Sequence, residues 1–388
     1  MTTGTIITRE RRTDTAPRDD DEGSLRAIVF DDPAPLEAAW RRLEREGCST
    51  AFQRFDWARS WYASASAAGI AEPMIIAVSR ADGGDPVAIF PFARTRSKLG
   101  FVIGFADGEV CDHTAPVLAS RTVLSDAAAA RACDLALAAV TGTDIVKLEK
   151  LVPTVGGRPN PLYHLNGAMP FPLASYSVPL DAGWEKRLDK GLVKNLTRAR
   201  RILREQKGEW SVVRAAPDEA GDVFADLLEQ RQARFAATGG TDILDHDHWR
   251  AHYAGLLSGP GVVFALRVGD EVVASEFGLT DGDTFLALLP GFRRDGDWKK
   301  YSLGQVLTVG IMEWCAAHGL KAYDMTIGSE AYKFAYGVTE TRLNAVMRPV
   351  SARGHAVTAL WRAKERLRDN PQLFTAAKKL FGPLTGRM

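Results

Sequence analysis

The sequence predicts an α+β protein of two domains, and three observations support this prediction. The chain has 388 residues, more than one hydrophobic core usually organises. Helical and strand-like hydrophobic periodicities alternate along it, and each half runs through helices, an antiparallel meander, a helix and a strand. Between the halves, residues 152–172 are rich in proline, glycine and asparagine, as linkers are.

These patterns divide the chain into four parts. We expect a disordered tail at 1–24, an N-terminal domain at 25–172, a C-terminal domain at 173–350 and a basic amphipathic tail at 351–388. The first 24 residues hold four Arg and six Asp or Glu, with too few apolar side chains to offset the entropy of ordering. No secretory signal or membrane-spanning segment is expected, so we expect a cytoplasmic protein.

The composition limits the class of site. Net charge is +1, which provides no global field for nucleic acid, and we expect no DNA partner. The four cysteines lie far apart, so neither a disulfide framework nor a zinc site is expected, and we expect no metal.

In the N-terminal half, periodicity and turn residues predict three helices and five strands. Strands are expected at 25–30, 74–79, 86–94, 101–110 and 144–148, and helices at 36–43, from 55 onward and at 126–140.

The C-terminal half repeats this order after a long basic helix at 184–207. A strand is expected at 210–214, helices at 217–237 and 247–257, strands at 261–268, 271–279 and 284–289, a helix at 303–317 and a strand at 321–325.

The segment most informative about chemistry begins in the strand at 284–289. Pro290-Gly291 cannot continue a regular ladder, so this strand should bulge or splay. A basic loop then leads to Tyr301-Ser302-Leu303-Gly304-Gln305 at a helix start. Free amides, a positive dipole end and a small residue suit a diphosphate, although Ser302 could also be an ordinary N-cap.

This order of splayed strand, basic loop and Tyr-Ser-Leu-Gly-Gln helix start resembles the acetyl-CoA-binding core of the GNAT acyltransferases. Gly304 stands without the second glycine of the familiar loop motif. Three further segments resemble the GNAT subgroup associated with cellulose and exopolysaccharide production, including holdfast-type polysaccharide-modifying N-acetyltransferases, with FemAB-like enzymes as wider relatives. They are 55–61, 194–201 and 328–337.

The resemblance implies two tandem GNAT-like domains, each a mixed, largely antiparallel sheet flanked by helices. It also implies a single donor site for acetyl-CoA or another acyl-CoA, in the C-terminal half. The residues we assign to donor binding are Leu288, Leu289, Arg293, Arg294, Lys299, Lys300, Tyr301, Ser302, Leu303, Gly304 and Gln305.

Acyl transfer from a thioester needs a backbone N–H for the carbonyl oxygen, a base and an acid. Leu288–Pro290 is the expected backbone position. Glu276, alone in an apolar strand, is the candidate base because burial should raise its pKa, unless it faces solvent. Asp324 is a second candidate base or a structural cap. Tyr332 and Tyr336 are candidate acids, or core residues.

Acceptor-binding candidates come from both halves. They are Asp112, His113, Lys333, Arg198 and Arg201. Lys333 could hold an anionic acceptor or be simply solvated. The basic helix could hold a lipid-linked sugar or tRNA, or be a solvated face.

The resulting hypothesis is an acyl-CoA-dependent N-acyltransferase that acts on an amino sugar, free or lipid-linked, in exopolysaccharide or cell-envelope biosynthesis. A FemAB-like enzyme that uses aminoacyl-tRNA is one alternative. Another is a non-catalytic membrane-associated GNAT-fold protein, because the basic tail could bind an anionic membrane at the inner face of the cell membrane or a regulatory nucleotide.

Overall fold

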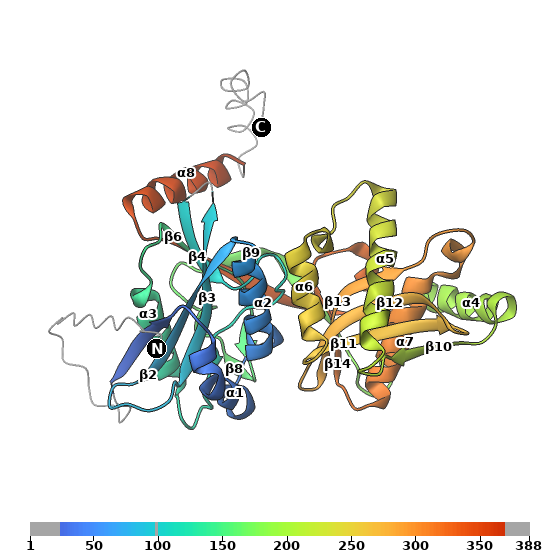
Figure 1. The fold of residues 1–388 in the computed structure, drawn as a ribbon, viewed down its shortest axis with the longest axis horizontal. Coiled ribbons are helices and arrows are strands. Elements are labelled where there is room, and N and C mark those ends of the chain that lie inside the picture. Colours follow the sequence, from blue (N-terminus) through green and yellow to red (C-terminus); the bar gives the residue numbers. More distant parts are fainter. Residues whose placement is uncertain (1–23, 98–99, 369–388) are drawn as a thin grey trace, which may run out of the picture.

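The computed structural model describes residues 24–97 and 100–368, and Figure 1 shows its two halves side by side. The N-terminal half consists of β1 (Leu25–Phe30), α1 (Glu37–Glu46), α2 (Phe55–Ala67), β2 (Ala71–Arg80), β3 (Ala88–Ser97), β4 (Gly100–Phe105), β5 (Val117–Leu118), α3 (Asp126–Ala139) and β6 (Ile145–Leu151).

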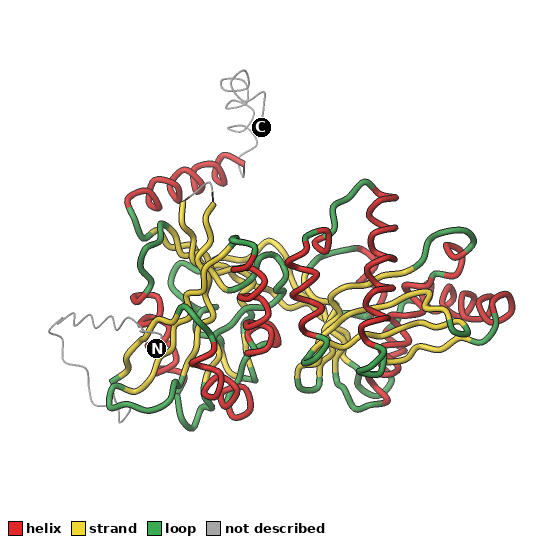
Figure 2. The backbone as a smooth tube through the Cα atoms, viewed as in Figure 1, coloured by secondary structure: helices red, strands yellow, loops and turns green. Residues whose placement is uncertain are grey.

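The C-terminal half repeats this order after a basic helix. It consists of α4 (Lys190–Lys207), β10 (Trp210–Arg214), α5 (Ala220–Thr238), α6 (Asp247–Leu256), β11 (Gly261–Val268), β12 (Glu271–Asp281), β13 (Thr284–Phe292), α7 (Leu303–Ala317) and β14 (Ala322–Ile327). The predicted α+β class with a repeated, largely antiparallel arrangement is therefore confirmed (Figure 2).

The two halves pair their strands in the same way. In the first, β1, β2, β3 and β4 are antiparallel neighbours and β4 pairs with β6 in parallel. In the second, β10, β11, β12 and β13 are antiparallel neighbours and β13 pairs with β14 in parallel.

Two strands exchanged between the halves join the main strands of both halves into one sheet. β9 (Met169–Pro179) follows the first half in sequence but pairs with β14 of the second. β15 (Thr339–Pro349) follows the second half but pairs with β6 of the first, and β9 and β15 pair with each other. A 13-stranded sheet results, so neither half has a complete set of ladder partners by itself.

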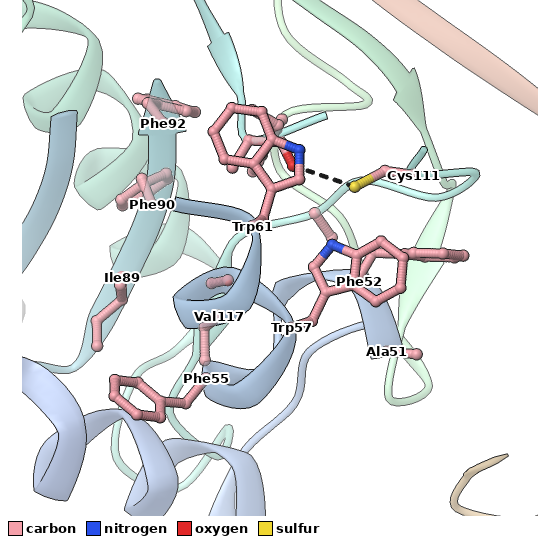
Figure 3. Packing of buried hydrophobic residues seen from close by; sticks show 14 of the residues in the cluster. Ala51, Phe52, Phe55, Trp57, Trp61, Ile89, Phe90, Phe92, Cys111 and Val117 are labelled. Atoms are coloured by element: carbon pink, nitrogen blue, oxygen red, sulfur yellow. Dashed lines mark hydrogen bonds between the residues drawn. The ribbon is translucent and has the colours of Figure 1, made fainter. Parts of the chain in front are cut away.

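Helical packing also connects the halves. In α2 the Trp57 ring lies edge-on to His252 of α6, with ring centroids 4.6 Å apart, and Ser60 Oγ donates to the His252 carbonyl at 3.0 Å. Burial lowers the pKa of His252 to about 3, so this imidazole is neutral. Figure 3 shows Trp57, Trp61 and the Phe52 ring gathered around the loop that contains Cys111.

Most predicted elements are confirmed, but β15 was not predicted, and three further differences concern predicted segments. The expected helix at 184–207 is a 3-10 turn, η3 (Trp184–Arg187), followed by α4, whose start is capped by Asp189 accepting from the amides of Gly191 and Leu192. The linker at 152–172 contains a two-stranded hairpin, β7 (Thr154–Val155) and β8 (Arg158–Pro159), and the beginning of β9.

The third difference is that β13 extends to Phe292 rather than ending near Leu289, because Arg231 of α5 donates to the Pro290 carbonyl at 3.1 Å and holds the strand beyond the proline. At the C-terminus, α8 (Ala352–Arg368) packs against β15. The remainder of the predicted basic tail and the predicted disordered residues 1–23 lie outside the described residues. No helix in the described part of the chain is long and apolar enough to cross a membrane.

Candidate active site

An irregularity is present in β13, but at Leu288 rather than at the predicted Pro290-Gly291, which both stay paired with β12. Along β12, Phe277 pairs with Leu289 and the next residue, Gly278, pairs with Ala287, so Leu288 is the extra residue of a β-bulge. Pairing of β13 with β14 stops at Leu286, two residues earlier. The two parallel strands therefore diverge from that point, and the bulge lies at the edge of the opening.

A cavity of about 600 Å³ occupies this opening. Its wall takes residues from α5 on one face of the sheet, from the first turns of α7 on the other, and from the 109–112 loop of the N-terminal half. The residues with polar or reactive groups are Glu109, Asp112, Arg231, Arg234, Glu276, Gln305, Thr308, Tyr323, Thr326, Glu330, Tyr332, Lys333 and Tyr336. Both halves thus contribute to a single site.

Glu276 is the buried carboxyl of this cavity. It is 3% exposed, and both of its carboxylate oxygens accept from the Tyr323 hydroxyl, at 2.9 and 3.1 Å. Burial raises the pKa of Glu276 to about 7, although the Tyr323 hydrogen bond opposes this shift. A carboxyl group that changes protonation near neutral pH suits a general base. The alternative of a solvent-facing glutamate is wrong.

Tyr332 and Tyr336 both line the cavity from η6 (Ala331–Tyr336), with ring centroids 6.4 Å apart. Tyr336 is buried, whereas Tyr332 is 56% exposed at the cavity mouth. Burial, followed by the charges of Glu330 and Glu276, raises the pKa of Tyr332, so its hydroxyl keeps its proton at neutral pH. A protonated hydroxyl is what the expected acid role requires.

The start of α7 leaves backbone amides available. Ser302 adopts a left-handed conformation (φ 50°, ψ 43°) and its side chain does not cap the helix. Its hydroxyl instead accepts from the Asn195 amide of α4 at 3.2 Å, and Asn195 also donates to the Gln305 side chain at 2.5 Å. Within the described residues the amides of Leu303 and Gly304 have no hydrogen-bond partner. Ser302 thus occupies the N-cap position, but its side chain does not cap the helix, and the first amides remain open to a ligand.

The basic loop before α7 is less available than the sequence suggests. Arg293 pairs with Glu271 and Asp295, and Lys300 pairs with Asp297 at 3.3 Å. Arg294 and Lys299 are exposed.

Tyr301 is fully buried, and its hydroxyl donates to Gln206 at 3.0 Å. Its ring packs 5.7 Å from that of Trp298. The Tyr301 side chain is therefore part of the core. Only the backbone of this residue is left to contact the donor as expected.

Lys333 is neither solvated nor free to hold an acceptor. It is 3% exposed, and its ammonium donates to the carbonyls of Thr326 and Ile327 at 3.2 and 3.0 Å and pairs with Glu330 at 3.1 Å. These contacts fix the end of β14 beside the cavity. Lys333 is better described as a positioning residue.

Asp324 and His113 meet through β9 rather than in the cavity. His113 Nε2 lies 2.8 Å from Ser175 Oγ and 3.9 Å from the Asp324 carboxylate. Asp324 also accepts from the Thr326 amide at 2.7 Å, where Thr326 has a positive φ of 58°. The hydrogen bond to the Thr326 amide supports the interpretation of Asp324 as a structural cap. The contacts among His113, Ser175 and Asp324 connect the N-terminal loop to β14.

Asp112, next to His113, does line the cavity. Burial raises its pKa to about 6, against the opposing charges of His113 and Lys150. By contrast Arg198 and Arg201 lie exposed on α4, where Arg201 pairs with Glu205 at 2.7 Å. The structure thus brings Asp112 to the reaction site and leaves the two arginines outside it.

Sequence reasoning missed several residues of the site, and four of them carry the argument. They are Tyr323, Asn195, Arg231 and Arg234. Of these, Tyr323 alone is marked by a local pattern, because it directly precedes Asp324 near the carboxyl end of a predicted strand. The others act across elements far apart in sequence, and no local pattern marks them.

Comparisons with known proteins agree with this geometry. Residues 190–334 match the family model described as the acetyltransferase (GNAT) domain. No curated protein sequence matches the chain.

Among solved structures, FemX has a TM-score of 0.53 at 10% identity, covering 81% of this chain and 96% of that one. The C-terminal domain of a putative lysylphosphatidylglycerol synthetase from Agrobacterium fabrum has a TM-score of 0.51 at 13% identity, covering 84% and 96%. L-PGS from Bacillus licheniformis has a TM-score of 0.50 at 14% identity, covering 86% and 96%. These identities show a shared fold only. With the family match and the site geometry, the C-terminal half is an acyltransferase domain of the GNAT type.

Proposed function

We propose that this protein is an acyl-CoA-dependent N-acyltransferase, with acetyl-CoA as its donor and an amino sugar of exopolysaccharide or cell-envelope biosynthesis as its acceptor. The observation that supports it best is the pairing of a bulge at Leu288 with a buried carboxyl, Glu276, across one cavity. The sugar acceptor rests on the resemblance of segments 55–61, 194–201 and 328–337 to the polysaccharide-associated subgroup.

In this proposal the donor lies between the bulge and the start of α7. The open amides of Leu303 and Gly304 bind its diphosphate, and the Leu288 amide donates to the thioester oxygen as that oxygen gains charge. When bound, acyl-CoA supplies an activated acyl carbon with a thiolate leaving group.

The proton movements follow from the two titratable groups. Glu276 accepts a proton from the attacking amine, which forms the new amide bond as the thioester bond breaks. Tyr332, protonated at the cavity mouth, donates to the departing thiolate. Tyr323 and Lys333 hold the strands that position these groups.

A second candidate is aminoacyl transfer from tRNA. The observation that favours it is the exposed cationic face of α4, where Lys190, Lys194, Arg198 and Arg201 recur at helical spacing. A lipid-linked sugar is another phosphate-rich ligand for that face, and would bring the protein to the inner face of the membrane.

Incubating the full chain with acetyl-CoA and a panel of amino sugars, free and nucleotide-linked, separates these candidates. We expect release of free CoA, measured by thiol titration, together with an acceptor heavier by one acetyl group. A parallel reaction contains charged tRNA in place of acetyl-CoA. Transfer from tRNA without transfer from acetyl-CoA would replace the first candidate by the second.

A further inference from the structure

Among the described residues that line the cavity, one cation has no carboxylate partner. Three cationic side chains line it. Arg231 forms a two-point pair with Asp242, at 2.6 and 2.8 Å, and Lys333 pairs with Glu330. Among the described residues the guanidinium of Arg234 has neither a carboxylate partner nor a hydrogen bond, although its backbone carbonyl accepts from the Thr238 hydroxyl. A partly covered charge without a counter-ion is unfavourable, so an anionic ligand there would be stabilised.

The guanidinium of Arg234 lies near the open start of α7. It lies 5.6 Å from the ring centroid of Phe292 and 5.4 Å from that of Phe235. The same Phe292 ring also lies beside Gly304, where an added Cβ would come within 3.3 Å of it. Arg234 and Phe292 also line a second hollow of about 900 Å³, so this arginine lies at the junction of two open spaces.

Of the four loop cations, two are paired within the protein, and the other two, Arg294 and Lys299, are exposed and do not line the cavity. Arg293 is engaged by Glu271 and Asp295, and Lys300 by Asp297. Arg234, by contrast, comes from α5, and its aromatic neighbours restrain the guanidinium without using its hydrogen-bond donors.

We propose that Arg234 anchors the diphosphate group of a ligand bound in the cavity. A planar guanidinium binds phosphate oxygens in a two-point geometry that a lysine cannot match. A diphosphate occurs both in an acyl-CoA donor and in a nucleotide-linked sugar acceptor. The inference therefore deepens the proposed function, on which it rests, and the test distinguishes the two sources.

The test is calorimetric titration of the full chain with CoA, with uridine diphosphate glucosamine and with pantetheine, which carries no phosphate. We expect Arg234→Gln to weaken the diphosphate ligand at least tenfold and to leave pantetheine unchanged. Arg267→Gln is the matched control: it removes one positive charge from the adjoining hollow, where Arg267 is paired with Glu219 at 3.4 Å, and should change neither affinity.

The outcomes separate this inference from the proposed function. Weakening of CoA alone assigns the diphosphate to the donor, and weakening of the nucleotide sugar alone assigns it to the acceptor. Binding of both ligands that survives in Arg234→Gln overturns the inference and leaves the proposed function standing. Wild-type protein that binds neither ligand removes both. If Arg234→Gln does not fold, Arg234→Lys decides, since the loss of two-point binding should still weaken the diphosphate ligand about threefold.

Discussion

The two halves of this molecule share one order of strands and helices, yet among the described residues only the second opens beside its parallel pair of strands. In the first half β4 and β6 pair at two positions and then diverge, as β13 and β14 do. The chain itself fills that divergence: Thr114 forms a parallel bridge with Leu151, its amide donates to Lys150, and its carbonyl accepts from the Val152 amide. The first half therefore offers no equivalent opening.

The helix that follows each meander shows the same contrast. Ser125 caps α3 by accepting from the Ala128 amide at 3.2 Å. Arg158, 3% exposed, donates to the carbonyls of Leu124 and Ser125 and pairs with Asp126 at 2.9 Å. The start of α3 is thus closed by the protein, whereas the start of α7 is left to a ligand. A repeated fold can devote one copy to forming a wall and the other to chemistry.

Substitution of Glu276, the buried carboxyl of the cavity in the second half, is the sharpest test of this contrast. Glu276→Gln should lower kcat by about 10²- to 10⁴-fold, the usual contribution of a general base. Donor affinity should change less than twofold, because the amide fills the same space. Steady-state kinetics and calorimetry measure the two. Glu219→Gln, an exposed substitution in the same half, is the control, and an unchanged kcat in Glu276→Gln would end the base assignment.

The two helix starts can be compared with one substitution in each. Gly304 and Ala127 are both second residues of their helices, and both are changed to Glu. Gly304→Glu should weaken CoA at least 100-fold, because it places charge and bulk beside Phe292 and the open amides. Ala127→Glu, exposed at the closed start of α3, should leave CoA affinity unchanged. Equal effects of the two would refute the difference between the halves.

The raised pKa of Glu276 also makes a prediction about pH. Because the folded-state pKa, about 7, exceeds the ordinary value of 4.5, the native state gains stability from this group below pH 4.5 and loses it as pH rises through 7. Relative to Glu276→Gln, the wild type should lose on the order of 3 kcal/mol of unfolding free energy between pH 4 and 8. In the same interval its kcat/KM should rise, since the ionised carboxylate is the active form. If the wild type and Glu276→Gln showed the same change in unfolding free energy with pH, and if kcat/KM did not change with pH, the assignment would be contradicted.

The smallest expected effect concerns the closed half. Ser125→Ala should lower the unfolding free energy by about 1 kcal/mol through loss of the α3 cap. CoA affinity should not change, because in the described part of the chain the start of α3 is closed by protein groups. Urea denaturation and calorimetry measure these quantities. A loss of CoA affinity with unchanged stability would place a donor site in the wrong half.

Much of the fold could be predicted because its signals are local. The meander of β11, β12 and β13 follows from apolar runs separated by Gly-Asp and Asp-Gly turns. The exchange of β9 and β15 could not be predicted, because strand pairing between segments about 170 residues apart leaves no local pattern.

The site divides in the same way. Pro290-Gly291 indicated an irregular strand, and an isolated glutamate among apolar residues indicated a desolvated carboxyl. The arginines and lysines of the loop were equally clear candidates in the sequence. Arg293 and Lys300, however, are paired with Glu271, Asp295 and Asp297, and the sequence alone did not show these pairs. Charge in a sequence does not show which charges are already paired.

By itself, then, the sequence determined where the repeated elements lie and that β13 is interrupted, since backbone propensity and hydrophobic period act over a few residues. The tertiary structure decided which copy stays open. It buried Glu276 beside Tyr323, closed the start of α3 with Arg158, and left Arg234 without a counter-ion among the described residues. Desolvation and charge pairing depend on neighbours supplied by distant segments, and those neighbours exist only once the two halves share one sheet.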